Sequence, residues 1–337
     1  MNADVGIVGG GIAGLAAARE LRAAGRSVVV FDKGRAAGGR CATRRAAPYT
    51  FDHGAQFFTV REPAFAQALA PFGDRLVQRW AGPFRTWQDG VLGPDPRPGE
   101  RYVAVPGMSA LARALAEPLG DVVQPGLRVE ALRCDGDGHW LSVRRLADDV
   151  VFVCGPFPAL VVALPPPQAR GLLATAGLEG PVVQRLDELA TSLQPCLAAM
   201  VAFCDGVPGG DGAWFVTDEV LGFAAHDGGK PGRSGEPTYV LHGTAPWSLA
   251  QFDQPLEASF AALLAAFARV VGGPLPEVVH RGMHRWRYAL ASPPPAGEAA
   301  VFDRELQLAA AGDAFVGGRV EGAFSSGVAA ARLVLSG

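Results

Sequence analysis

The chain has 337 residues, 49% of them hydrophobic, which is enough for two domains with large cores. Its formal net charge of −3 gives no general attraction to nucleic acid or to an anionic membrane surface. No apolar run approaches the roughly 18 residues of a membrane-spanning helix, and no signal peptide precedes the first predicted strand. We therefore expect a cytoplasmic protein that acts on small molecules.

The cysteines give no sign of a disulfide framework or of a zinc site. They are odd in number, include no Cys-x-x-Cys pair and have no histidine nearby at ligand spacing. The six histidines are scattered and form no metal-ligand pattern. We expect no bound metal, and the cysteines are interpreted as small, mostly buried residues. They are Cys41, Cys134, Cys154, Cys196 and Cys204.

The first predicted elements are a strand, a glycine-rich turn, a helix and a second strand. The strand 5–8 runs into a turn that contains Gly9, Gly11 and Gly14, and the next apolar run ends at Asp32. Gly9 allows the tight turn, Gly11 lets the backbone approach a pyrophosphate, and Gly14 lets helix and sheet pack closely. The helix N-terminus offers unpaired N–H groups to phosphates, and Asp32 is placed to accept ribose hydrogen bonds. The pattern predicts a dinucleotide site.

Less regular segments follow this unit. A loop rich in glycine and arginine covers 34–45, and the segment 63–72 is predicted to be helical. Proline and glycine between 82 and 99 indicate an irregular connection. A further helix is predicted to begin near Ser109, where serine supplies an N-cap before leucines at helical spacing.

The middle of the chain predicts five strands, at 122–124, 127–132, 140–144, 150–154 and 160–164. The last two are near-continuous apolar runs, so we expect them to be buried strands of a central sheet. Helices and strands then alternate with loops up to 295. The predicted helices in this part are 168–176 and 256–271, and the predicted strands are 196–204 and 239–243. The segment 306–335 again predicts a strand, a turn and a helix.

These elements predict an α/β protein with two domains. The first is a Rossmann-type dinucleotide-binding domain with a central parallel sheet, expected to comprise 1–60, 101–165 and 296–337. The second is an inserted α+β substrate domain, expected to comprise 61–100 and 166–295. The change of pattern after 165 is the basis for this division.

Longer fingerprints along the chain carry a resemblance to a known family. They lie at 9–15, 38–45, 52–57, 106–110, 241–248, 284–289, 312–313 and 318–327. In this order they resemble the FAD-dependent amine oxidase family of flavoproteins and, within it, the bacterial renalases. The resemblance covers nearly the whole length. It implies an amine oxidase-like two-domain fold, in which the Rossmann-type domain binds FAD.

The resemblance implies FAD as the permanent cofactor, held non-covalently because no cysteine follows Cys204 to tether it. Arg40 is expected to meet pyrophosphate oxygens in a bidentate way, with Thr43 adding a hydroxyl. Asp313 is expected to accept bonds from ribityl hydroxyls, and the following helix start to direct N–H groups at the pyrimidine end of the flavin. The full predicted cofactor set is Gly9, Gly11, Ala13, Gly14, Asp32, Lys33, Gly39, Arg40, Thr43, Gln56, Phe57, Val129, Gly312, Asp313, Glu321, Gly322 and Ala323.

Several of these residues also have a purely structural explanation. Arg40 lies in an arginine-rich loop that solvent alone would satisfy. Asp313 is suited to be an ordinary helix N-cap, and Val129 is suited to a strand core. The sequence leaves both explanations open.

Amine oxidases of this family resemble one another in a lysine that holds a water near flavin N5 and in tyrosines that form a cage around the amine. The sequence shows neither feature convincingly. Lys33 lies on the adenine side, Lys230 lies in a glycine-rich loop, and Arg319-Val320 stand where the resemblance implies a tyrosine. The resemblance to renalases implies instead the oxidation of 2- or 6-dihydro isomers of NAD(P)H. Hydride would pass to flavin N5, and dioxygen would be reduced to hydrogen peroxide. The expected partners are therefore a dinucleotide substrate and dioxygen.

Aromatic and polar residues are the candidates for the substrate slot. His242, Phe57 and Trp286 are predicted to be catalytic, and Phe58, Trp247, Arg287 and Tyr288 to bind substrate. Each has a structural alternative: His242 as a satisfied core histidine, the phenylalanines as core, Trp286 as interdomain packing and Arg287 as an ion-pair residue. Two rival functions also stay open, namely an amine oxidase acting on a small amine and a non-catalytic flavin- or NAD-binding sensor module.

Overall fold

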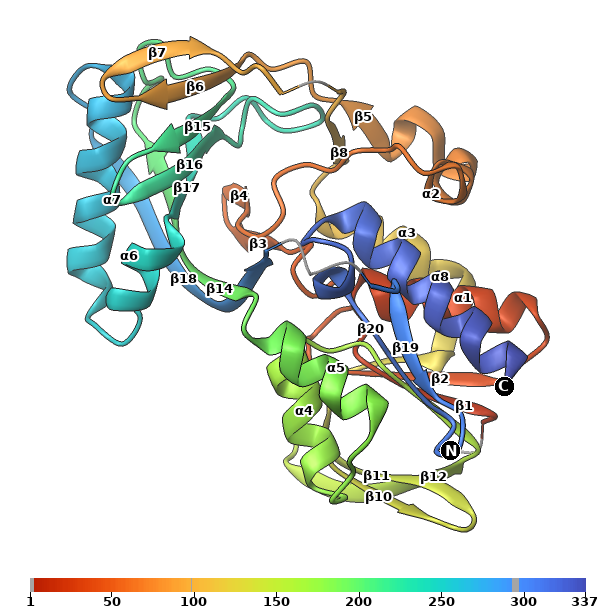
Figure 1. Ribbon diagram of the computed structural model, residues 1–337. Coiled ribbons are helices and arrows are strands. Elements are labelled where there is room, and N and C mark those ends of the chain that lie inside the picture. Colours follow the sequence, from red (N-terminus) through yellow and green to blue (C-terminus); the bar gives the residue numbers. More distant parts are fainter. Residues whose placement is uncertain (1–2, 98, 293–296) are drawn as a thin grey trace.

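Two β-sheets organise the chain, a mainly parallel sheet of six strands and a mainly antiparallel sheet of seven (Figure 1). The computed structural model describes residues 3–97, 99–292 and 297–337. In Figure 1 the six-stranded sheet lies at the lower right, close to both chain ends, and the seven-stranded sheet at the upper left. The predicted two-domain architecture with a Rossmann-like unit is confirmed.

The six-stranded sheet has the order β19-β20-β13-β1-β2-β9, and only the edge strand β19 runs antiparallel. Its strands are β1 (Val5–Val8), β2 (Val28–Asp32), β9 (Val123–Pro125), β13 (Ala159–Val162), β19 (Ala300–Asp303) and β20 (Leu308–Ala311). The strands β1, β2, β13 and β20 are buried along their whole length. Such strands need cover on both faces, which explains their continuous apolar sequences.

Different elements cover the two faces of this sheet. Ile7 of β1 packs in one core together with the helices α1 (Ile12–Ala23), α3 (Ser109–Ala116) and α8 (Val320–Ser336). The next residue, Val8, packs in a second core on the opposite face. That face is covered by β10 (Leu127–Asp135), β11 (Gly138–Arg145), β12 (Val150–Phe157), α4 (Pro166–Ala174) and α5 (Pro181–Ala190).

The seven-stranded sheet has the order β18-β14-β17-β16-β15-β6-β7. Its strands are β6 (Phe84–Gln88), β7 (Val91–Pro94), β14 (Leu193–Phe203), β15 (Ala213–Thr217), β16 (Leu221–His226), β17 (Thr238–Gly243) and β18 (Val278–Ala291). The helix α7 (Leu256–Val271) covers one face, with the short α6 (Ala245–Ala250) beside it (Figure 1). The opposite face packs on Phe51 through Met200 and Val240, so it is turned toward the six-stranded part.

Shorter elements connect the two sheets. They are β3 (Thr43–Ala46), β4 (Tyr49–Asp52), α2 (Pro63–Leu69), β5 (Val77–Arg79) and β8 (Tyr102–Ala104), with 3-10 turns at Ala70–Arg75, Glu117–Val122 and Asp313–Phe315. In Figure 1 the strands β3 and β4 lie between the two sheets. They bring the segment after Asp52 close to both.

The packing differs from the expected domain boundaries in two places. The helices α4 and α5 were assigned to the substrate domain, yet Leu173 and Leu186 pack in the same core as Val8 of the first sheet. Phe65 of α2 packs with Ile12 and Leu15 in the core beneath α1. The α4–α5 segment and the α2 segment are both amphipathic, and each packs its apolar side against the first domain. The predicted boundary at 295/296 lies outside the described residues.

Two local expectations were wrong. The segment between 82 and 99 was interpreted as irregular, but it contains the β6–β7 hairpin of the large sheet. The run 150–154 was expected in the central sheet, but it forms β12 at the edge of the three-stranded sheet β10-β11-β12. Val151 and Val153 of β12 are 48% and 64% exposed. These two side chains point outward, and sequence periodicity alone does not distinguish such a partly exposed apolar strand from a fully buried one.

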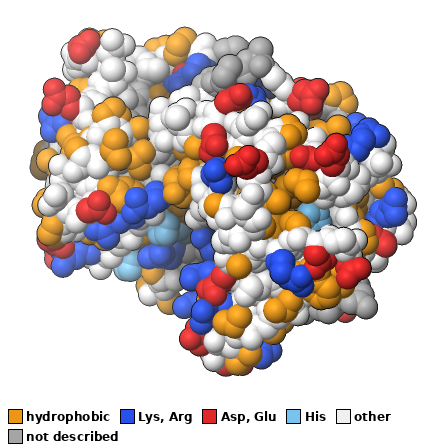
Figure 2. Space-filling model, turned by 60° about the horizontal axis from the view of Figure 1, so that its bottom comes forward, with side chains coloured by type: hydrophobic (Ala, Val, Ile, Leu, Met, Phe, Trp, Pro, Cys, Tyr) orange, Lys and Arg blue, Asp and Glu red, His pale blue; other side chains and the backbone are white. Residues whose placement is uncertain are grey.

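The surface has a hollow in which basic side chains gather. Figure 2 shows Lys or Arg and His side chains around this hollow, on the face turned forward from the view of Figure 1. Within the ranges that the structure describes, every helix is too short or too polar to cross a bilayer.

Candidate functional site

The glycine-rich turn after β1 has the geometry that the dinucleotide hypothesis requires. Gly9 has φ +109°, and a Cβ there would lie 2.4 Å from the Ala163 carbonyl oxygen. A Cβ at Gly14 would lie 1.9 Å from the Gly9 carbonyl oxygen, whereas a Cβ at Gly11 would meet nothing within 4 Å. Gly11 is also the N-cap of α1, so among the described residues no N-cap side chain takes up the first N–H groups of the helix. Open space before an uncapped helix N-terminus fits a pyrophosphate.

Asp32 lies at the end of β2 beside this turn. Its Oδ2 accepts the Gly10 N–H at 2.6 Å and its Oδ1 accepts the Gly34 N–H at 2.5 Å. Burial raises the pKa of Asp32, although both hydrogen bonds oppose that effect. A carboxylate has about four acceptor positions, so two remain for ribose hydroxyls. Lys33 is exposed, and Val129 of β10 packs against the second core, in keeping with its structural explanation.

The second glycine loop closes onto the first. The Gly38 N–H donates to the Gly10 carbonyl at 2.9 Å, and a Cβ at Gly39 would lie 3.5 Å from Gly11 Cα. Arg40 Nη2 contacts Asp313 Oδ1 at 2.5 Å, and its Nη1 donates to the Tyr288 carbonyl at 3.2 Å. Arg40 and Asp313 were expected to contact different parts of FAD, and here they contact each other. The pair joins the first domain to β18.

The predicted flavin-side helix start has a well-defined structural role. The Glu321 carboxylate accepts the Glu62 N–H at 2.7 Å, the Thr59 hydroxyl at 3.1 Å and the Arg61 N–H. It thereby anchors the residues just before α2 to the neighbouring helix α8. Gly322 follows in the first turn of α8, where a Cβ would collide with Val316 Cγ2 at 2.7 Å.

These features test whether the chain fits FAD. A Cβ at Gly9 or Gly14 would collide with a backbone oxygen, whereas a Cβ at Gly11 would enter the open space before the uncapped N-terminus of α1. The two glycine loops, the start of α1 and the Asp313 segment are together called the cradle. Buried Asp32 and Asp313 provide acceptors at its two ends. The residues therefore fit an extended dinucleotide. Asp32 and α1 would hold its adenosine and phosphate half, and the Asp313 segment its other half.

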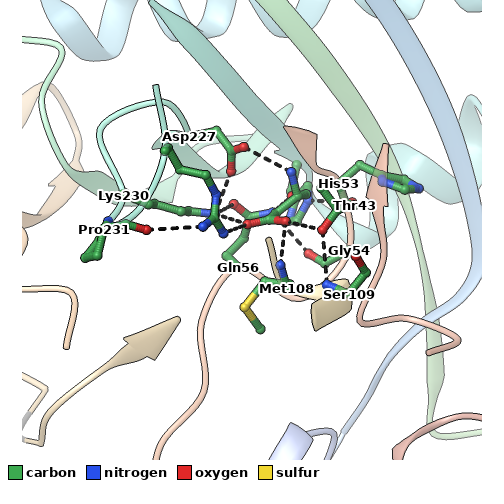
Figure 3. A network of polar contacts seen from close by, with 12 residues as sticks. Thr43, His53, Gly54, Gln56, Met108, Ser109, Asp227, Lys230 and Pro231 are labelled. Atoms are coloured by element: carbon green, nitrogen blue, oxygen red, sulfur yellow. Dashed lines mark hydrogen bonds and ion pairs between the residues drawn. The ribbon is translucent and has the colours of Figure 1, made fainter. Parts of the chain in front are cut away.

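A buried polar network surrounds Asp52, and Figure 3 shows two of its members, Thr43 and Met108. Asp52 Oδ1 accepts the Thr43 hydroxyl at 2.6 Å and the Met108 N–H at 2.8 Å, and Arg233 Nη2 contacts Oδ2 at 2.5 Å. Thr43 also accepts the Ser109 N–H at 3.1 Å. Thr43 was predicted to contact pyrophosphate, but its hydroxyl proton is committed to Asp52.

Lys230 lies at the centre of this network, which sequence reasoning did not predict. Its Nζ donates to Asp227 Oδ1 at 2.6 Å and to Gln56 Oε1 at 3.0 Å, and it lies 3.6 Å from Asp52 Oδ2 (Figure 3). Burial alone would raise the pKa of Asp52, but Lys230 and Arg233 beside it lower that pKa below its ordinary value. Burial raises the pKa of Asp227, against the pull of Lys230.

The carbonyl of His53 brings two predicted catalytic residues together. Trp286 Nε1 donates to it at 2.9 Å, and His242 Nε2 lies 3.2 Å from it. Because a carbonyl only accepts, His242 carries its proton on Nε2 and keeps Nδ1 as an acceptor. Burial lowers the pKa of His242 to about 4 and that of His53 to about 4. Both imidazoles are neutral at pH 7.

The seven-stranded sheet explains why these rings meet. Ala198 of β14 pairs with His242 of β17 on one side and with His284 of β18 on the other. The small Ala198 leaves room for His53, whose ring stacks on Trp286 at 5.2 Å and meets His284 at 4.9 Å. The face of the sheet opposite α7 therefore presents a row of rings to the 52–58 segment.

Phe57 lies in an aromatic cluster at the end of that row. Its ring centroid is 6.2 Å from those of Phe84 and Phe215, and 6.4 Å from Phe223, which in turn lies 5.9 Å from His242. The Arg101 guanidinium fills the cluster. Its central carbon lies 4.1 Å from the Phe84 ring centroid and 5.4 Å from those of Phe57 and Phe215.

Three of the remaining substrate candidates, Trp247, Arg287 and Phe58, do not join this group. Trp247 packs against the core beneath α7, and exposed Arg287 stacks over Phe252 at 4.4 Å. Arg287 lies one residue from Trp286 on β18, so it points to the opposite face of the sheet. Phe58 is a buried core residue against Phe65, as its structural alternative predicts. Tyr288 contributes its carbonyl to Arg40.

Sequence reasoning missed Arg101 and Asp227, and it gave Asp52 and Lys230 no role in the site. No local motif marks them, because Asp52 meets Lys230, and Arg101 meets Phe57 and Phe215, only in the folded chain. Cys41 and Cys196 are buried, as expected, whereas Cys204 is exposed. Among the described residues there is no group of three or more His, Cys, Asp or Glu side chains that could hold a metal.

A cradle of this kind defines a dinucleotide-binding protein. Residues 7–72 match the model of NAD(P)-binding Rossmann-like domains. Residues 95–335, more than half of the chain, match the model of flavin containing amine oxidoreductases. The chain therefore belongs to the flavin containing amine oxidoreductase family. It is a flavin-dependent oxidoreductase, and its family implies FAD as the cofactor.

Individual relatives agree with this family. A Mycobacterium tuberculosis protein whose name assigns it to the flavin-containing monoamine oxidases is 36% identical over 94 residues, which cover 25% of this chain and 21% of that protein. The chain thus spans about a fifth of the length of the curated relatives it matches.

Solved structures are similar over the whole chain at low identity. They include a putrescine oxidase bound to putrescine (TM-score 0.72, 16% identity, 100% of both chains) and cyclohexylamine oxidase from Brevibacterium oxydans IH-35A (TM-score 0.74, 16%, 100% and 99%). A third, from Exiguobacterium sp. 255-15, is named a protoporphyrinogen oxidase (TM-score 0.77, 16%, 99% of both chains). At this identity the likeness concerns the fold alone.

Proposed function

We propose that the protein is a renalase-like oxidase of the 2- or 6-dihydro isomers of NAD(P)H. When bound, FAD would accept a hydride at N5 and pass two electrons and one proton to dioxygen, which takes a second proton from solvent to give hydrogen peroxide. A dihydropyridine ring nitrogen expels the hydride without a strong base. The protein then has to bind and orient a flat ring and to exclude water.

The observation that carries this proposal is the occupied aromatic cluster. Amine-binding aromatic cages hold an external cation, but here Arg101 already lies over Phe84, Phe57 and Phe215. Arg101 and Arg97 share the Asp95 carboxylate, so one net positive charge stays beside the rings. A second cation about 5 Å from that charge would be repelled by roughly 3 kcal/mol at an effective dielectric constant near 20. A neutral flat ring with an anionic tail avoids that repulsion.

The bonding of Lys230 supports the same proposal. An ammonium group has three N–H donors, and Asp227, Gln56 and Asp52 stand at 2.6, 3.0 and 3.6 Å from Nζ. Its side chain is fully buried. Two hydrogen bonds and the ion pair with Asp52 thus hold Nζ inside the buried network rather than at an external reactive water.

In the proposed reaction His242 and Trp286 orient the donor ring. Their N–H groups are both committed to the His53 carbonyl, which fixes the ring planes. Neutral His242 keeps Nδ1 as an acceptor toward a carboxamide N–H, and Trp286 offers a flat apolar wall. Phe57 closes the other side of the row.

The first test is an anaerobic comparison of donors with the FAD-loaded protein. We expect the 2- or 6-dihydro isomers of NAD(P)H to bleach the flavin much faster than 4-dihydro NAD(P)H, putrescine or cyclohexylamine. Flavin absorbance after rapid mixing measures the rate. Fast bleaching by an amine, with none by the isomers, would overturn the proposal and favour an amine oxidase. Bleaching by none of these donors would favour the sensor module.

The family membership and the structural likeness to putrescine and cyclohexylamine oxidases support an amine as the second candidate substrate. The amine would have to bind in its neutral form, because Arg101 repels the protonated one. The donor comparison above distinguishes the two candidates. A rate that rises steeply with pH would be expected for the amine alone.

We also propose that FAD is held without a covalent bond, since no cysteine follows Cys204. Acid precipitation of the purified yellow protein should release FAD into the supernatant. The chromophore is identified there by its fluorescence before and after hydrolysis to FMN. Colour that stays in the protein pellet contradicts the non-covalent attachment.

A further inference from the structure

Two arginines approach the aromatic cluster from the segment between β7 and β8. The Arg97 guanidinium carbon lies 3.3 Å from the Phe215 ring centroid, and that of Arg101 lies 4.1 Å from the Phe84 centroid. Both bind Asp95, Arg97 through Nε at 2.7 Å and Arg101 through Nη2. One carboxylate between two guanidinium groups leaves one net positive charge beside the rings.

Asp95 fixes the two guanidinium groups in place. Its side chain is 1% exposed, and although burial opposes ionisation, the hydrogen bonds and charge of Arg97 keep the pKa of Asp95 below its ordinary value. Because Asp95 takes Nε of Arg97, the two terminal nitrogens of that guanidinium have no acceptor among the described side chains and carbonyls. The Arg97 side chain is 50% exposed, so these donors face solvent.

We propose that Arg97 and Arg101 form an anion-binding subsite that takes a phosphate group of the substrate's dinucleotide tail. The identity of the substrate rests on the proposed function. A guanidinium fork matches two phosphate oxygens, and stacking on Phe215 holds its plane before the ligand arrives. Phe57 belongs to the same aromatic cluster, so the subsite adjoins the slot for the dihydropyridine ring.

Paired substrates test the subsite in the FAD-loaded protein. The 6-dihydro isomer of NADH carries a pyrophosphate, and the 6-dihydro isomer of N-methylnicotinamide carries none. The quantity measured is the KM for the NADH isomer divided by the KM for the N-methylnicotinamide isomer. In Arg97→Gln this ratio should rise roughly tenfold to a hundredfold, the loss expected for one charge-assisted bidentate contact. An unchanged ratio overturns the proposal.

Arg85→Gln is the matched control. Arg85 belongs to the neighbouring hairpin and also stacks on a ring, with its guanidinium carbon 5.6 Å from the Trp214 centroid. Trp214 lies in the core beneath α7, on the other face of the sheet. Arg85→Gln should therefore leave the KM ratio unchanged, and a rise equal to that of Arg97→Gln would make the effect a general loss of charge.

Equilibrium dialysis with inorganic pyrophosphate separates this proposal from the proposed function. With FAD bound, the wild type and Arg85→Gln should bind pyrophosphate more tightly than Arg97→Gln, and high salt should abolish the difference. If no isomer is oxidised but this difference persists, the proposed function fails and the subsite stands. Equal or absent binding in all three proteins overturns the subsite. Should Arg97→Gln melt early, Arg97→Lys keeps the charge but loses the fork, and the same comparison applies.

Discussion

Asp52→Ala should lower the free energy of unfolding by about 3–5 kcal/mol, the loss expected when a buried ion pair loses one partner. The substitution leaves the buried cations Arg233 and Lys230 without their shared carboxylate, and the Thr43 hydroxyl and Met108 N–H without an acceptor. Urea unfolding of the purified protein, followed by fluorescence, measures the change.

The matched control for this experiment is Asp148→Ala. Asp148 pairs with Arg145 at 2.9 Å, but their side chains are 48% and 50% exposed. Exposed pairs contribute about 0–1 kcal/mol, so this variant should unfold almost like the wild type. Equal losses in the two variants would mean that Asp52 is not a node of a buried network.

Acid should weaken the Asp52 contribution in a defined direction. Lys230 and Arg233 lower the pKa of Asp52 from 3.8 despite its burial. A lowered folded-state pKa gives stability that is fully present above the ordinary value and is lost as pH falls through the folded value. The stability difference between wild type and Asp52→Asn should therefore be constant near neutral pH and shrink progressively as the pH falls below about 4. A difference that changes between pH 6 and 8 would contradict this assignment.

His242→Ala should slow reduction of the bound flavin by the isomers roughly tenfold to a thousandfold, the range for losing one positioned polar group. The pKa of His242 is about 4 because of burial, so the wild-type rate should not titrate between pH 6 and 8. Stopped-flow absorbance measures the rate, and a melting curve accompanies it. His242→Gln, which keeps a donor for the His53 carbonyl, should recover part of the rate.

His139→Ala serves as the control for His242. His139 is buried in β11, and its Nε2 contacts the Leu306 carbonyl at 2.8 Å, a similar arrangement far from the ring row. Its loss should lower the melting temperature and leave the reduction rate of the folded protein unchanged. If His242→Ala also changes only the melting temperature, His242 is a core histidine.

The sequence predicted best what is local. The turn with Gly9, Gly11 and Gly14 is recognisable because strand, turn and helix are consecutive, and the helix bounds 256–271 agree with α7. The ion network was not predictable in this way. Lys230 and Gln56 are 174 residues apart, and only the folded chain brings them together.

Sheet faces account for the other misses. Trp286 and Arg287 are adjacent in the sequence, and strand alternation sends them to opposite sides of β18. The motif at 284–289 was treated as one functional unit without its strand geometry. Knowing that this segment is a strand would have separated the two residues, whereas the face that meets His53 depends on the whole sheet.

The close packing of α8 on α1 has a consequence for the order in which the protein becomes functional. A Cβ at Gly327 would lie 2.0 Å from the Ala13 carbonyl oxygen, so the two helices touch at the helix start that faces the cradle. During synthesis β20 and α8 emerge long after α1, β2 and the glycine loops that they support. The glycine loops are therefore synthesised before β20 and α8, the elements that stabilise their folded conformation. Cofactor capture is therefore expected to be a late event, coupled to closure of the whole chain.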